Sequence, residues 1–105
     1  MVIIETSVFT RRINELLTDE EYRLLQHELV ERPDSGKVIQ GSGGMRKLRW
    51  GLPGRGKRGG ARIIYYWIVD QNTIMMLYAY AKNELTDLTP QQIRALRKVV
   101  EDEFK

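Results

Sequence analysis

The 105-residue sequence predicts a single α+β domain, in which an antiparallel β-sheet packs against an N-terminal helical hairpin and a C-terminal helix. With 42% hydrophobic residues, the chain is long enough to form one core and too short for two. Apolar residues recur at helical spacing near both ends, and β-branched or aromatic runs between Gly-rich turns fill the middle. Because no internal repeat or linker interrupts this order, we expect residues 1–105 to form one domain.

The N-terminal third predicts a short strand followed by two helices. Residues 2–4 are apolar and suit a strand, and the next segment repeats apolar residues on one helical face: Phe9, Ile13, Leu16 and Leu17. Thr18 to Glu21 spells TDEE, a capping box with acidic residues where the helix dipole favours them. The apolar stripe of this second helix is Tyr22, Leu25 and Leu29. Pro33 ends the helix, so the two helices are predicted to form a hairpin.

The middle of the chain predicts three strands. A polar, Gly-rich stretch leads into residues 45–50 (MRKLRW), where basic and apolar residues alternate as in a half-buried strand. Residues 63–69 are apolar throughout and β-branched or aromatic, which predicts a central strand. Residues 70–73 predict a turn, and residues 74–81 the returning strand.

The C-terminal segment predicts the last helix. Thr89 is placed to cap it, Pro90 occupies the first helical position, and Gln92 completes a second capping box. The expected buried stripe is Ile93, Leu96, Val100 and Phe104. The predicted element order is therefore β-α-α-β-β-β-α.

Positive charge is concentrated in one contiguous third of the chain. The net charge is +3, from 17 Lys and Arg against 14 Asp and Glu. Eight of these cations, with no acidic residue among them, lie between positions 37 and 62: Lys37, Arg46, Lys47, Arg49, Arg55, Lys57, Arg58 and Arg62. The remaining nine cations share the rest of the chain with all 14 acidic residues. Such asymmetry favours a polyanionic partner, most simply a nucleic acid.

Composition also argues against several classes of protein. The chain has no cysteine, which excludes a disulfide framework and a thiolate zinc site, and one histidine makes a protein-only transition-metal site improbable. Only four apolar residues precede Glu5, fewer than a signal peptide needs. No window approaches the ~20 apolar residues of a membrane helix. We therefore expect a cytoplasmic protein without cofactor, metal or membrane partner.

Strand pairing predicts where the cations meet. If the hairpin turn is centred near Asn72, the residue numbers of each facing pair sum to about 144, which places Lys82 beside Arg62. Folding the preceding strand back in the same way places Arg49 beside Arg62, with Lys47 two residues along on the same face. Four cations thus converge at one end of the sheet. The opposite face is expected to be core: Leu48, Trp50, Ile63, Tyr65, Trp67, Met75, Leu77 and Ala79.

The converging cations require compensation. Like charges in contact repel by about 1 kcal/mol per pair at water-like dielectric, so a bound phosphate gripped by Arg is the expected partner. Candidate RNA-binding residues extend this surface: Arg46, Arg55, Lys57, Arg58, Tyr66 and Tyr80. Tyr66, Tyr78 and Tyr80 would share the cationic face and could stack on bases, although half-buried tyrosines are also ordinary strand residues. The basic loop likewise fits a solvated hairpin tip.

Three other signals lead to weaker hypotheses. Gly51 to Lys57 fits the spacing of a nucleotide-binding P-loop, but Arg58 replaces the magnesium-binding Ser or Thr and a strand follows in place of a helix. His27 lies in the second helix, away from the cations, and is expected to be an ordinary helical residue. Glu84 and Asp87 supply two carboxylates, which without further ligands are weak candidates for magnesium.

Three segments resemble a known family: GSGGMRKLRW, GKRGGARIIYYW and YAYAKNELTDLT. Together with TDEEYRLLQHEL, they are similar to the HigB-like branch of the RelE superfamily of bacterial toxins, over nearly the whole chain. The resemblance implies the RelE fold. It also implies an endoribonuclease that cuts messenger RNA in the ribosomal A site, inhibits translation, and is neutralised by a cognate antitoxin of the helix-turn-helix HigA type.

The resemblance also implies catalytic residues. Arg62 matches the family's arginine at the scissile phosphate, Lys47 and Arg49 match its alternating basic pair, and Lys82 matches a basic residue ending the last strand. Asn83 and, approximately, Thr89 stand where members often carry a further arginine and a tyrosine, so the general base and acid stay open. Neighbouring arginines disfavour a protonated lysine, which makes Lys82 or Lys47 the candidate base for metal-independent attack by a ribose 2′-hydroxyl.

Two alternative functions fit the same sequence. A toxin of the ParE type has this fold but acts on DNA gyrase without nuclease activity, a mode that has no need of four converging cations. A plain RNA- or ribosome-binding module would use the cations only to hold the phosphate backbone. Its binding would depend steeply on salt, and it would cut nothing.

Overall fold

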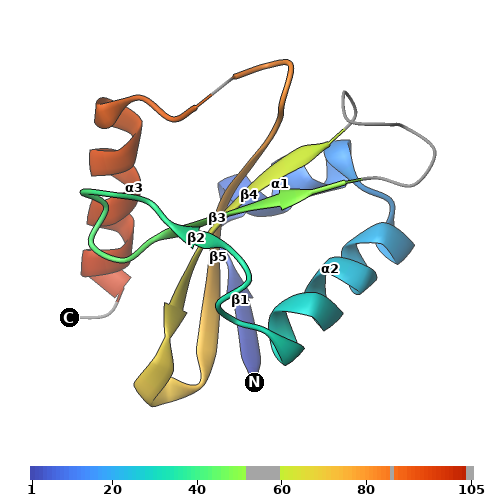
Figure 1. Cartoon of the computed structure of the whole chain (residues 1–105), viewed down its shortest axis with the longest axis horizontal. Helices are drawn as coiled ribbons and strands as arrows, with labels where there is room; N and C mark the ends of the chain where they lie inside the picture. Colours follow the sequence, from blue (N-terminus) through green and yellow to red (C-terminus); the bar gives the residue numbers. More distant parts are fainter. Residues whose placement is uncertain (52–59, 86, 104–105) are drawn as a thin grey trace.

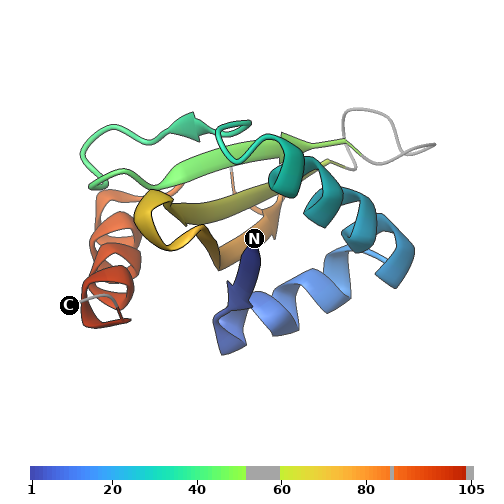
Figure 2. The ribbon, with the colours of Figure 1, turned by 90° about the horizontal axis from the view of Figure 1, so that it is seen from below.

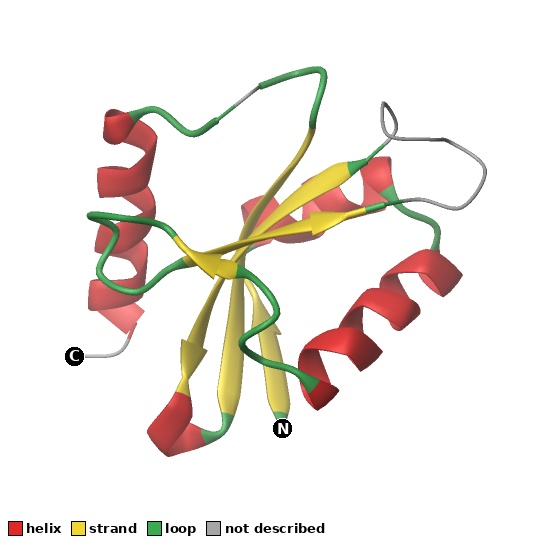
Figure 3. Cartoon of the chain, in the orientation of Figure 1, coloured by secondary structure: helices red, strands yellow, loops and turns green. Residues whose placement is uncertain are grey.

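A computed structural model describes residues 1–51, 60–85 and 87–103. Figure 1 shows the elements, whose bounds are β1 (Val2–Glu5), α1 (Ser7–Leu16), α2 (Asp19–Glu31), β2 (Lys37–Val38), β3 (Arg46–Trp50), β4 (Ala61–Ile68), β5 (Thr73–Ala81) and α3 (Pro90–Glu103). The five strands form one sheet in the order β1-β5-β4-β3-β2. The expected α+β class is confirmed, with helices before and after the central strands, as Figure 3 shows by colour.

Each face of the sheet is covered by different helices. In Figure 2, α3 lies on the left of the strands and α1 and α2 lie on the right. One apolar cluster joins α1 and α2 to the sheet: Phe9, Ile13, Leu17, Leu25, Leu29, Ala61, Ile63, Tyr65, Ile74, Met76 and Ala79. A second cluster lies on the α3 side: Met45, Ile64, Met75, Leu77, Tyr80, Leu88 and Val100. The central strands β4 and β5 are therefore buried on both faces, which explains their continuous apolar sequence.

The predicted helix caps are present. The Thr18 side chain accepts from the Glu21 backbone N–H at 3.1 Å, and the Glu21 carboxylate accepts from the Thr18 N–H at 2.8 Å. At α3, Thr89 and Gln92 make the same reciprocal pair at 2.8 and 3.1 Å. These bonds satisfy N–H groups that the first helical turn leaves without partners. Phe104, expected in the α3 stripe, lies outside the described residues.

Two features of the sheet differ from the prediction. The edge strand β1 runs parallel to β5, pairing Val2 with Thr73 and Glu5 with Met76, so the sheet is mixed instead of antiparallel. In addition, β2 pairs with β3 within a stretch expected to be irregular. Both residues of β2 are exposed, so the sequence has no alternation of apolar and polar residues that would predict a strand there. The β1–β5 pairing joins segments far apart in the chain, which local sequence does not encode.

A β-bulge corrects the predicted register. The numbers of facing residues in β4 and β5 sum to 142 from Ala61 to Ile64 and to 141 from Tyr65 onward, so Leu77 is an extra residue in β5. The bulge exchanges the two faces of β5, since side chains alternate with a period of two. Met75 and Leu77 consequently lie in the α3 cluster, not with Tyr65 as expected. The Thr6 hydroxyl donates to the Leu77 carbonyl at 2.9 Å, which satisfies a group that the bulge removes from the ladder.

The turn between β4 and β5 occupies residues 69–72, one position earlier than predicted. It is a single 3-10 turn (Val69–Gln71) followed by Asn72 in the left-handed region, at a φ of 49°. Asparagine is among the few non-glycine residues that adopt this conformation readily.

Within the described ranges, no helix is both long enough and apolar enough to cross a membrane.

Candidate functional site: a cationic face at one end of the sheet

The cationic face consists of Lys47, Arg49, Arg62 and Lys82. Arg49 of β3 is directly opposite Arg62 of β4, as predicted, and Lys47 lies two residues away on the same face. The residue opposite Arg62 in β5 is Tyr80 and not Lys82, because the turn occupies a different position from the one assumed. Lys82 is two residues beyond, and its N–H donates to the Gly60 carbonyl at 3.1 Å, beside the start of β4.

Arg62 is the most deeply buried cation of this face. Its exposed fraction is 8%, and it has no ion pair or hydrogen bond with any residue that the structure describes. Enclosure of most of this side chain restricts where the guanidinium group can lie. A fold that retains such a group is suited to an anion that binds there, and Arg can hold phosphate oxygens through two parallel hydrogen bonds.

Tyr80 supplies a second unpaired polar group beside Arg62. Its side chain is 1% exposed, and its hydroxyl has no hydrogen-bond partner in the described part of the chain. Burial, followed by the charge of Asp87, raises the pKa of Tyr80, while Arg62 opposes the shift. The hydroxyl is therefore protonated at neutral pH and can donate. Because the ring is enclosed, Tyr80 offers no free face for stacking on a base, contrary to the prediction, and its 5.9 Å ring contact is with Tyr78.

A carboxylate lies on the same face. Asp87 accepts a hydrogen bond from the Lys47 ammonium group at 2.8 Å. This bond is the main reason that the pKa of Asp87 is lowered, with burial opposing it and the charges of Lys47 and Arg49 adding to it. Asp87 is thus ionised at neutral pH and forms an ion pair with Lys47. No three His, Asp or Glu side chains in the described ranges gather as metal ligands, so the magnesium hypothesis gains no support.

A cleft of about 480 Å³ opens beside the cationic face. Its wall includes Lys47, Arg49 and Asp87, together with Lys37 and Gln40 from β2 and the residues after it. This volume lies within the range of small-molecule sites in proteins. Lys37 is opposite Lys47 in the β2–β3 register, so both side chains lie on one face. Sequence reasoning counted Lys37 among the cations but did not place it at the site, because β2 was not predicted.

The remaining predicted RNA-binding residues are distributed elsewhere. Arg46 donates to the Gly36 carbonyl at 2.8 Å and, by strand alternation, lies on the face opposite Lys47, so it supports the β2 loop. Tyr66 is half-buried in the α3 cluster, four residues along β4 from Arg62. Arg55, Lys57 and Arg58 lie outside the described residues, as does most of the P-loop-like stretch. His27 is exposed on α2.

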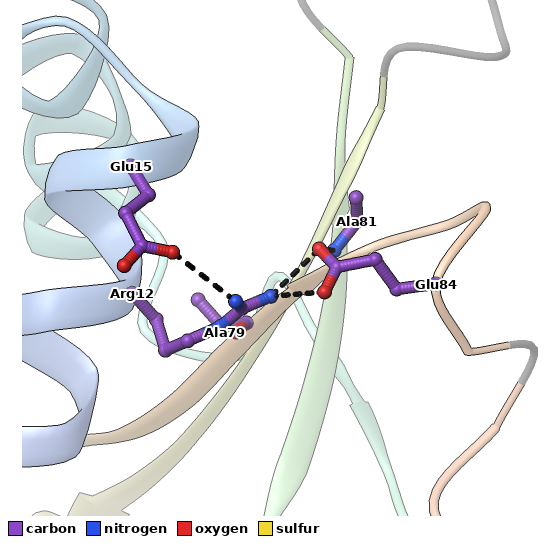
Figure 4. Close-up of polar contacts among 5 residues, drawn as sticks. All are labelled: Arg12, Glu15, Ala79, Ala81 and Glu84. Carbon is purple, nitrogen blue, oxygen red and sulfur yellow. Dashed lines mark hydrogen bonds and ion pairs between the residues drawn. The ribbon is translucent and has the colours of Figure 1, made fainter.

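An ion-pair cluster fastens the end of β5 to α1, as Figure 4 shows. Arg12 donates to both oxygens of the Glu84 carboxylate at 2.6 Å and to the Ala79 carbonyl at 3.0 Å. Glu84 also accepts from the Ala81 N–H at 3.0 Å. The hydrogen bond from Arg12, followed by that from Ala81, lowers the pKa of Glu84. Glu84 therefore anchors the turn that carries Lys82, a role that sequence reasoning missed.

Comparisons with known proteins agree with this architecture. The sequence model of the family described as the RelE toxin of the RelE/RelB toxin-antitoxin system matches residues 1–105. A mutant of the Escherichia coli toxin RelE in the free state is similar in structure, with a TM-score of 0.55 and 13% identity, over 94% of this chain and 95% of that one. A conserved hypothetical protein from Helicobacter pylori, HP0892, has a TM-score of 0.52 and 15% identity, over 80% of this chain and 97% of that one. At these identities the structures show a shared fold.

Proposed function

The chain belongs to the RelE toxin family, and we propose that it is a HigB-like, ribosome-dependent endoribonuclease that cuts messenger RNA in the A site. The observation that carries the proposal is Arg62, an 8% exposed residue that lies directly opposite Arg49 and has no hydrogen-bond or ion-pair partner among the described residues. Two guanidinium groups held side by side on a rigid sheet suit a phosphate that gains negative charge during reaction.

The proposed reaction is transesterification within the RNA strand. The ribose 2′-oxygen forms a bond to the adjacent phosphorus, and the bond from phosphorus to the 5′-oxygen breaks. The products are a 2′,3′-cyclic phosphate and a 5′-hydroxyl. Arg62 and Arg49 would stabilise the dianionic pentacoordinate phosphate. Because these cations supply the positive charge, the proposed reaction requires no metal ion.

The general base that takes the 2′-proton is proposed to be Lys82. The Lys47 ammonium group is held at 2.8 Å by the Asp87 carboxylate, which leaves Lys82 as the better candidate. Lys82 has no side-chain partner among the described residues and is held near Arg62 by its backbone bond to Gly60. The leaving 5′-oxygen takes up a proton from solvent, which balances the proton that Lys82 accepts from the 2′-hydroxyl.

The proposed partners follow from the family. Members are toxins of a toxin-antitoxin system, so a cognate antitoxin is the expected inhibitor; we propose one of the helix-turn-helix HigA type. The ribosome would orient the messenger RNA against the cationic face and supply much of the entropic advantage. The proposed compartment is the cytoplasm, where ribosomes and messenger RNA are found.

Primer extension on a reporter messenger RNA during brief induction tests the proposal. We compare the wild type with Arg62→Lys, which conserves charge but removes two-point phosphate binding, and use a reporter without a start codon as a control for translation. Cuts inside the reading frame should disappear in the variant and on the untranslated reporter. Growth arrest without cuts would favour the ParE-like gyrase inhibitor. Salt-sensitive RNA or ribosome binding without cuts would favour the non-catalytic module.

A further inference from the structure

We propose that the cleft beside β2 is a subsite for the nucleotide next to the scissile phosphate, with Lys37 contacting its phosphate and Gln40 its base. The inference rests on RNA being the substrate, as proposed above. It assigns a binding role to two residues outside the cationic face, and it predicts how they act.

The walls of the cleft combine the chemistry that a nucleotide needs. Val38, Ile39 and Leu48 supply apolar surface for a base or ribose, and Ile39 is itself packed against the α3 cluster. Lys37 and Gln40 add a cation and an amide to the same wall. Single-stranded RNA is recognised through exposed base faces and edges together with phosphate contacts. A volume of about 480 Å³ is sufficient for one nucleotide.

The polar groups of the cleft differ in their availability. Lys47 is engaged by Asp87, and the Ser35 hydroxyl lies 2.6 Å from the Arg32 carbonyl and 2.9 Å from the Glu28 carboxylate. Lys37 and Gln40 are exposed, and neither side chain has a hydrogen bond or ion pair with any described residue. They can therefore bind a ligand without breaking an internal contact.

The backbone that carries both residues is fixed. Gly36, directly before Lys37, donates to the buried Tyr65 hydroxyl at 2.8 Å. On the other side, the Ile39 N–H donates to the Met45 carbonyl at 2.7 Å, and the Ser42 hydroxyl lies 2.5 Å from the Ile39 carbonyl. Ordering of this loop thus costs little when a ligand binds, which favours affinity.

The sheet places Lys37 beyond the reacting centre. Arg62 lies in β4, Lys47 in β3 and Lys37 in β2, so Lys37 is two strands from Arg62 and two residues along the sheet. With strands about 4.8 Å apart and a rise of about 3.4 Å per residue, the two Cα atoms are roughly 12 Å apart. Lys37 is therefore assigned to the neighbouring nucleotide and not to the phosphate held by Arg62.

Fluorescence anisotropy with a labelled single-stranded hexaribonucleotide tests the subsite. Every ribose of the probe carries a 2′-O-methyl group, so the RNA cannot be cut. Binding is measured between 50 and 200 mM salt for the wild type, Lys37→Gln, Gln40→Ala and Lys98→Gln. The last variant makes the same charge change at an exposed position of α3, outside the cleft. The experiment thus separates a local contact from the loss of net charge.

Loss of one phosphate contact should lower the salt slope by ~0.7 and weaken binding about eightfold at 50 mM for Lys37→Gln, with Lys98→Gln close to the wild type. Gln40→Ala should weaken binding without changing the slope, because an amide releases no counterion. Equal effects of the two lysine variants, or no binding by the wild type at 50 mM salt, would overturn the inference. Since the probe is not cleavable, binding that depends on Lys37 supports the subsite even where messenger RNA cleavage fails.

Discussion

Replacing Tyr65 with Phe should destabilise the protein by about 2–3 kcal/mol, although the change removes a single oxygen from a fully buried side chain. The Tyr65 hydroxyl donates to the Pro33 carbonyl at 2.7 Å and accepts from the Gly36 N–H at 2.8 Å. It thereby fastens the segment before β2 to the central strand.

The magnitude follows from these two bonds. Gly36 is buried, so its N–H would lose its partner without gaining water, at a cost of about 1–3 kcal/mol. The bond to Pro33 adds about 0.5–1.5 kcal/mol. Since a domain of this length loses roughly 4–5 °C of Tm per kcal/mol, the expected fall in Tm is about 10 °C. The ring, and with it most of the apolar contact, is retained.

Tyr80 provides the matched control, since it is equally buried in the adjacent strand but its hydroxyl has no partner in the described chain. Tyr80→Phe should leave stability unchanged or raise it by about 1 kcal/mol, because no bond is lost and an unpaired polar group is removed. Thermal unfolding followed by circular dichroism at pH 7 measures both variants. Equal changes in Tm would refute the reasoning, and so would a larger loss for Tyr80→Phe.

Three further predictions concern charged residues. Arg62→Met should raise Tm, because it removes the repulsion between like charges at the facing positions of Arg49 and Arg62, and should abolish messenger RNA cleavage; a fall in Tm would show that Arg62 stabilises the fold. Pairing with Arg12 lowers the folded-state pKa of Glu84 below its ordinary 4.5. The Arg12–Glu84 ion pair therefore stabilises the folded protein above pH 4.5, and this contribution is lost as pH falls through the folded-state pKa. The Tm difference between wild type and Glu84→Gln should accordingly be about 4 °C at pH 7 and shrink as pH falls below 4.5, whereas a constant difference would contradict the ion pair. Asp87→Asn should tighten binding of the uncleavable hexanucleotide at low salt and steepen its salt slope by ~0.7, because Lys47 becomes free to bind phosphate; unchanged binding would argue against that competition.

The sequence by itself determined the features that depend on near neighbours. Thr18 with Glu21, and Thr89 with Gln92, form capping boxes because the groups involved are three residues apart. Strand periodicity placed Arg49, Arg62 and Lys47 on one face, since their side-chain directions follow from alternation along antiparallel strands. The cationic character of the candidate site, and its place at one end of the sheet, were therefore readable from sequence.

Only the tertiary structure determined which residues far apart in the sequence contact each other. The bulge at Leu77 exchanged the faces of half of β5, and it is supported by Thr6, 71 residues away in sequence. Asp87 reaches Lys47 across 40 residues, and Glu84 reaches Arg12 across 72. Such contacts form when packing brings segments together. No local pattern of residue types encodes them, which is why the sequence indicated a phosphate-binding face and the fold revealed the cleft and the carboxylates beside it.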